Sequence, residues 1–215
     1  MPRRALGGAE RRAVVHVGAA VPISVPPVGF DRRRIGVCLS AELVADFHVA
    51  PALGVIAVTG ELDPVVKALA VNGEEVRLVH YPSGHTDGDT VVFFVNSNVV
   101  HLGDDFFVGM FPFVDLDSGG SVRGLMTNIA ALIREIPEDA KIIPGHGPVA
   151  TLNDLKEYHS LITDSVKIVE DGMKAGKTLE GLKADGLPER FAKAGEGFIK
   201  TPAWIETIYR DLSKK

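Results

Sequence analysis

Cysteine is almost absent from the 215-residue chain, which contains only Cys38. A single cysteine excludes an internal disulfide framework and fits a reducing compartment. The chain also lacks a run of about 18 apolar residues, the length that a membrane-spanning helix requires. The apolar segment 14–25 resembles the core of a signal peptide, but His16 and Pro22 interrupt it and Pro26 follows it. We therefore expect a cytoplasmic protein.

An excess of positive charge is missing as well. The formal net charge is −5 at pH 7, whereas a general nucleic-acid-binding protein has a basic surface. A chain that is 46% apolar and 24% charged has the composition of an ordinary soluble globular protein. Neither nucleic acid nor a membrane is therefore an expected partner.

Lysine is absent from the first 66 residues, and this absence marks a break in the sequence. All eleven lysines lie at Lys67 or later, whereas seven of the twelve arginines lie before it. Because natural domains tend to be locally consistent along their length, one hypothesis is that residues 1–66 are an out-of-frame stretch. The rival hypothesis is a genuine but divergent N-terminal region. The gene's nucleotide sequence distinguishes them, since a +1 frame rich in stop codons excludes the first.

We accordingly expect two regions: an atypical N-terminal region, residues 1–66, of uncertain structure, and an α/β region, residues 67–215. In the second region, Asn72 and Gly73 have the composition of a hairpin turn. Alternating or continuous apolar patterns predict strands at 75–80, 90–95, 98–102 and 141–143. Helical periodicity predicts helices at 121–136, from 151 to near 176, and from 201 onward. Strands followed by a helix, a strand and a helix indicate a layered α/β fold.

Three polar residues follow these predicted strands: His85, Asp104 and His146. The ends of strands are where a sheet presents reactive groups to a cleft. Imidazole nitrogen and carboxylate oxygen are ligands of a borderline metal such as Zn²⁺. Taken singly, each residue has a plainer reading, since a lone histidine is usually structural or solvated and an aspartate after glycine usually forms a turn.

Four neighbouring residues could support such a site. Asp87 and Asp89 lie in the turn of His85, where they would either orient the imidazole or simply form the turn. Phe107 and Phe111 lie in an aromatic stretch after Asp104, where they would either wall a substrate pocket or fill the core.

The stretches "GHTDGDTVVFF", "HLGDDFF" and "KIIPGHGP" together resemble the second half of a metallo-β-lactamase domain, over about residues 72 to 212. The resemblance implies an αββα sandwich with a dinuclear zinc site at the sheet edge. It also implies hydrolysis of ester, thioester or lactam bonds by a metal-activated hydroxide. On this resemblance His85 ligates the first metal ion, Asp104 bridges both ions, and His146 ligates the second.

The family's H-x-H-x-D-H motif is absent, although it should precede His85 by some tens of residues. The only histidines before His80 are His16 and His48, and neither has a neighbouring His or Asp at the required spacing. We therefore expect hydrolysis to be impaired by the loss of the first-metal ligands, so that a small-molecule substrate is expected only if the chain is active. The alternative is a catalytically silent member that acts by binding or by forming a homodimer through an exposed sheet edge.

Overall fold

The structure is a computed structural model that describes residues 12–17, 38–39, 56–59, 67–71 and 73–214. The chain divides into two compact units, residues 1–63 and 64–215. The first unit contains β1 (Arg12–Val17), β2 (Cys38–Leu39) and β3 (Ile56–Thr59). β1 pairs in parallel with β2 and antiparallel with β3. Of the two histidines noted in this region, His16 lies in β1, and His48 lies outside the described residues.

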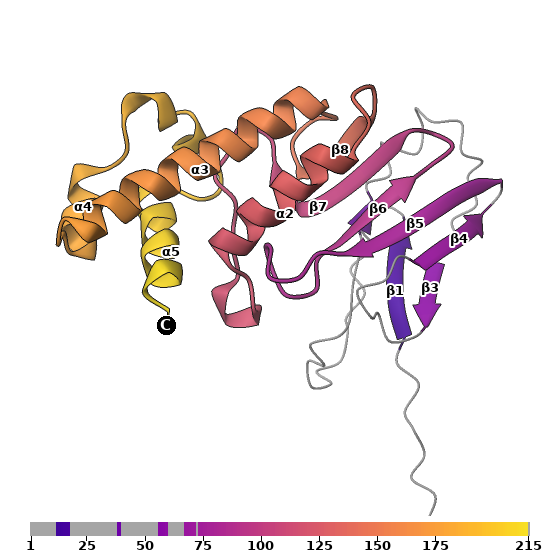
Figure 1. Cartoon of the computed structure of the whole chain (residues 1–215), viewed down its shortest axis with the longest axis horizontal. Helices are drawn as coiled ribbons and strands as arrows, with labels where there is room; N and C mark the ends of the chain where they lie inside the picture. The colour runs from indigo at the N-terminus through magenta and orange to yellow at the C-terminus, as the bar shows by residue number, and fades with distance from the viewer. Residues whose placement is uncertain (1–11, 18–37, 40–55, 60–66, 72, 215) are drawn as a thin grey trace, which may run out of the picture. The chain divides into compact units, whose positions relative to one another are not determined.

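The second unit is built on a five-stranded sheet in chain order. Its strands are β4 (Lys67–Val71), β5 (Glu74–His80), β6 (Thr90–Phe94), β7 (Val99–Phe107) and β8 (Lys141–His146). β4 to β7 are antiparallel neighbours, and β8 is parallel to β7. Figure 1 shows β4 at the edge farthest from the C-terminal helices. The strands predicted at 75–80, 90–95 and 141–143 are confirmed, whereas the alanine-containing β4 was not predicted because alanine is a weak strand former.

β7 is longer than the predicted strand, which ended at Leu102. It continues through Gly103 and Asp104 to Phe107, so Asp104 lies within the strand and not after it. The pairing of β7 with β8 is irregular on both sides of Gly103, which has a φ of 55°. Such an irregularity turns a strand locally and redirects its side chains. His146 is likewise the last residue of β8 and not part of a following loop.

Three helices form where the sequence predicts them. α2 (Val122–Glu135) begins after Ser121, whose hydroxyl accepts a hydrogen bond from the backbone N–H of Gly124. α3 (Leu152–Lys174) begins with a capping box, and α5 (Thr201–Ser213) has proline in its first turn. The short helix α4 (Leu179–Asp185) was not predicted, because it buries only Leu182 and so shows little periodicity.

The helices and one face of the sheet share a single apolar core. Each of the three long helices contributes an apolar stripe to it, as their 3.6-residue periodicity requires. Its fully buried members include Leu102, Phe106, Phe111, Leu125, Ile129, Leu132, Ile142, Leu155, Ile162, Trp204, Ile205 and Ile208. Among the described residues, no helix is both long and apolar enough to cross a membrane.

Candidate metal centre

The turn between β5 and β6 carries His85. Donors in α2 and in the segment before it form hydrogen bonds with backbone carbonyls of this turn. Asn128 of α2 donates its side-chain N–H to the carbonyl of Pro82 at 3.1 Å. The backbone N–H of Ser121 donates to Gly84 at 3.0 Å, and that of Asp115 donates to His85 at 2.9 Å. The position of His85 is therefore set by α2 and its preceding loop as well as by the sheet.

Glycines make this close approach feasible. A Cβ atom at Gly124 would overlap with the carbonyl of Ser83, and one at Gly120 would overlap with the carbonyl of His85. A Cβ atom at Gly84 would overlap with the carboxyl of Asp105. The Gly-rich stretch before α2 thus lets two backbones lie against each other next to the site.

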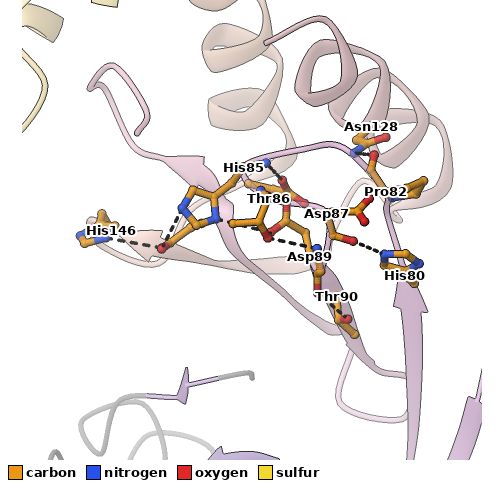
Figure 2. Close-up of polar contacts among 12 residues, drawn as sticks. His80, Pro82, His85, Thr86, Asp87, Asp89, Thr90, Asn128 and His146 are labelled. Carbon is orange, nitrogen blue, oxygen red and sulfur yellow. Dashed lines mark hydrogen bonds and ion pairs between the residues drawn. The ribbon is translucent and has the colours of Figure 1, made fainter. Parts of the chain in front are cut away.

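Asp89 fixes the orientation of the His85 ring. The carboxylate of Asp89 accepts hydrogen bonds from the backbone N–H of Thr86 at 2.9 Å and from its hydroxyl at 2.8 Å. Its Oδ1 atom also lies 3.4 Å from Nδ1 of His85 (Figure 2). With the ring proton on Nδ1, Nε2 presents its lone pair on the opposite side of the ring, which is the arrangement of a metal-ligating histidine backed by a carboxylate.

Asp104 lies between the two predicted imidazole ligands. Its Oδ2 atom is 3.8 Å from Nε2 of His85, and its Oδ1 atom is 3.5 Å from Nε2 of His146. Gly145 permits this arrangement, because a Cβ atom there would overlap with Oδ1 of Asp104. The structure thus brings together three residues that are up to 61 positions apart in the sequence (146 − 85). Each carboxylate oxygen faces a different imidazole.

Aromatic rings lie against both imidazoles. Phe107 is buried and stacks on His146, with ring centroids 4.5 Å apart and an interplanar angle of 18°. Phe113 lies against His85, with centroids 5.9 Å apart. These contacts restrict the rotation of the imidazole rings.

The charges around His85 favour a bound cation. Burial alone would lower the pKa of His85, but the hydrogen bond to Asp89 and the charges of Asp89, Asp104 and Asp115 outweigh it and raise the pKa. Within the described part of the chain, the ion pairs of lysine and arginine involve other carboxylates, such as that of Glu135. The carboxylates near His85 are therefore an unbalanced negative set.

Asp105 lies behind the site and is almost completely buried. Its Oδ1 atom accepts a hydrogen bond from the backbone N–H of His85 at 3.2 Å. Burial first, and then the negative charge of Asp89, raise the pKa of Asp105 well above its usual range. Burial also favours the neutral form of Asp89, but hydrogen bonds from His85 and Thr86 hold the pKa of Asp89 below its usual value. The ionised form is therefore favoured at Asp89 and the neutral form at Asp105.

Two predicted site residues lie away from this group. Asp87 is exposed, and its backbone carbonyl accepts a hydrogen bond from Nε2 of His80 at 2.7 Å (Figure 2). Phe111 is fully buried and stacks on Trp204, with centroids 5.5 Å apart. Asp87 thus lies in the turn and Phe111 in the core, and a supporting role at the metal site stays a prediction for both.

The donor set fits a metal ion chemically, although it is incomplete. Zinc accepts imidazole nitrogen and carboxylate oxygen, and the second nitrogen of His85 is already occupied by Asp89, as in known zinc sites. Within the described residues, however, no group of three or more His, Cys, Asp or Glu side chains could hold one ion. The contacts form two pairs, His85 with Asp104 and Asp104 with His146. Catalytic zinc usually has three protein ligands, so each pair is a partial site.

Comparison with known proteins rests on structure. No protein-family profile and no curated protein sequence matches the chain. The structure is similar to the sec-alkylsulfatase Pisa1 from Pseudomonas sp., with a TM-score of 0.56 and 13% identity over 69% of this chain. A double mutant of that sulfatase gives a TM-score of 0.57 at 13% identity over 70% of this chain. A metallo-β-lactamase from Pontibacter korlensis gives 0.43, with 17% identity over 59% of this chain and 57% of its own.

The sulfatase likeness decides the architecture. The matched part of the chain has a metallo-β-lactamase-like α/β fold. This confirms the fold class and the resemblance expected from the sequence over the matched part of the chain. The chain spans about a quarter of the sulfatase's length, 26% for the double mutant and 25% for Pisa1. At 13% identity the likeness establishes the metallo-β-lactamase fold and not an activity.

Sequence reasoning missed Asp105 and Asn128, which support the centre from behind. Each interrupts an apolar pattern: Asp105 lies within the run of β7, and Asn128 lies three residues after Leu125 on the buried face of α2. A polar side chain at a core position usually has a specific partner. In the metallo-β-lactamase fold of this chain, both partners are in the His85 turn.

Proposed function

We propose that the second unit is the metal-binding half of a hydrolase with the metallo-β-lactamase fold, and that zinc is its metal. One observation carries the proposal: Asp104 faces His85 with one carboxylate oxygen and His146 with the other. A carboxylate between two imidazoles is suited to binding two cations side by side. The bonds that it would hydrolyse are those of esters, thioesters or lactams.

Some residues of the chain would hold the metal, and others orient the residues that hold it. His85 and His146 would hold the metal through Nε2, and Asp104 would contribute one oxygen to each side. Asp89 keeps His85 in the tautomer that leaves Nε2 free, while Phe107 holds the ring of His146. Bound zinc would supply a Lewis acid and lower the pKa of a water molecule.

A silent binding protein is the second candidate. The absence of a three-residue ligand group from the described residues favours it. A hydrolase of this kind needs at least one tightly held ion, whereas a silent binder needs none. Bound metal therefore separates the two candidates.

The test is zinc per chain, measured by elemental analysis after dialysis. We expect the wild type to retain zinc, and both His146→Ala and Asp104→Asn to lose most of it. His159→Ala is the matched control, because His159 lies on α3 and contacts the carbonyl of Met126. Zinc that is retained equally in all four proteins, or absent from all of them, would contradict the proposal. Zinc-retaining protein is then assayed with ester, thioester and lactam substrates.

A further inference from the structure

Phe113 is a large apolar side chain that is both exposed and next to a candidate ligand. Phe113 is 45% exposed, and its ring centroid is 5.9 Å from that of His85. Burying an aromatic ring stabilises a protein substantially, so a ring left half in water beside the reacting centre is available for another apolar partner.

The exposure of Phe113 is built into the chain around it. Its neighbours Phe111 and Val114 are buried, with exposed fractions of 0% and 4%. On the C-terminal side, the backbone N–H of Asp115 donates to the carbonyl of His85. The segment is therefore anchored on both sides of Phe113, and the ring stays beside His85.

We propose that Phe113 binds an apolar group of the substrate, an alkyl chain or an aryl ring, next to the bond that is cleaved. This inference rests on the proposed function, because it takes His85 as a ligand of the reacting centre. The Phe113 ring lies 5.9 Å from the imidazole of His85, so it can contact only the part of a substrate that lies close to a group held at His85. Selectivity should therefore increase over short chains and level off for longer ones.

The test measures binding rather than turnover. Acetohydroxamic, butyrohydroxamic and hexanohydroxamic acids chelate zinc through the same head group and differ only in chain length. Their dissociation constants are measured by calorimetry on the zinc-loaded full chain. We expect binding to tighten about twofold to fourfold for each methylene group that reaches the ring, and Phe113→Ala to abolish this dependence.

Two further variants make the result specific. Phe113→Leu keeps an apolar side chain and should retain part of the dependence on chain length. Phe198→Ala removes another exposed phenylalanine, 77% exposed and located just before α5, and should leave the dependence unchanged. Equal affinities across the series in the wild type, or the same slope in Phe113→Ala, would overturn the role of Phe113.

Failure of the proposed function gives a different result. If the protein holds no zinc, the hydroxamates lose their anchor, and binding of 1-hexanol to the zinc-free chain is followed by ligand-observed NMR. Hexanol binding that disappears in Phe113→Ala would support the apolar subsite while contradicting the metal site. Absence of hexanol binding would contradict the inference itself.

Discussion

Asp89 orients the ring of His85 so that its Nε2 atom is available as a potential metal ligand. Its carboxylate is fixed by two hydrogen bonds from Thr86 and faces Nδ1 of His85, so the ring cannot easily present Nδ1 to a metal. Behind the site, Asp105 accepts a hydrogen bond from the backbone N–H of His85. Orientation of the ligand thus depends on residues that do not themselves bind the ion.

Asp89→Asn should weaken zinc binding by about 10-fold to 100-fold, the usual effect of changing a residue that orients a ligand. The physical reason is that an amide removes the negative charge that favours the proton on Nδ1 of His85. Affinity is measured by competition with a chromophoric zinc chelator.

Asp87→Asn is the matched control. It replaces the same type of side chain two residues away, at a position that is exposed. Its zinc affinity should equal that of the wild type. Equal losses in both variants would show that general negative charge, and not the contact with His85, matters.

At the scale of elements, α5 secures α2 through one buried carboxylate. Oδ2 of Asp211 accepts hydrogen bonds from the backbone N–H of Val122 at 2.9 Å and from the hydroxyl of Ser121 at 3.1 Å. The first N–H groups of a helix have no partner within the helix, and a negative charge there also interacts favourably with the helix dipole. Because α2 holds the His85 turn, α5 supports the site indirectly.

Asp211→Ala should lower the free energy of unfolding by about 2–3 kcal/mol, since it leaves buried donors without an acceptor. Urea unfolding is followed by the fluorescence of Trp204, the only tryptophan, which is fully buried in the second unit. Asp164→Ala removes a carboxylate from an exposed ion pair with Arg190 and should have little effect. The capping role would be wrong if the two variants were equally stable.

The start of α3 should show a pH-dependent contribution to stability. The hydroxyl of Thr151 and its backbone N–H hold the pKa of Asp154 below its usual value. Because the pKa is lowered in the folded state, the stabilisation is present above the unfolded pKa of about 3.9. It is lost as the pH falls through the folded value.

The stability difference between wild type and Asp154→Ala should therefore be about 0.5–1 kcal/mol at pH 7 and should shrink at pH values below about 4. Thr178→Ala removes the hydroxyl that caps α4, a group without charge, so its effect should not change with pH. Unfolding curves at pH 7, 5 and 3 provide the measurement. A pH-independent effect of Asp154→Ala would contradict the role of the carboxylate.

Elements with strong local signals were predictable. α2, α3 and α5 carry caps and apolar stripes within their own sequence, and β5 and β6 have apolar patterns bounded by turn residues. β4 and α4 lack such signals, and the continuation of β7 beyond Leu102 depends on its parallel pairing with β8, about 40 residues later. The contact of Asp211 with α2 joins residues 89 positions apart, so no local sequence pattern predicts it.

At the scale of the whole molecule, the site is a long-range assembly. His85 comes from the turn after β5, Asp104 from the irregular part of β7, and His146 from the end of β8. Spacing alone could not bring these residues together, and the resemblance to the metallo-β-lactamase superfamily was what predicted the grouping. The resemblance implies further ligands within residues 1–66. These residues are described only in three short strands, so the frame hypothesis stays a prediction.

The most direct test of the metal centre is a crystal structure of the zinc-treated full chain, with anomalous differences measured at the zinc edge. We predict zinc peaks beside Asp104, at about 2.0–2.2 Å from its oxygens and from Nε2 of His85, His146 or both. A map with no peak within bonding distance of Asp104, or with zinc only at unrelated histidines such as His159, would contradict it.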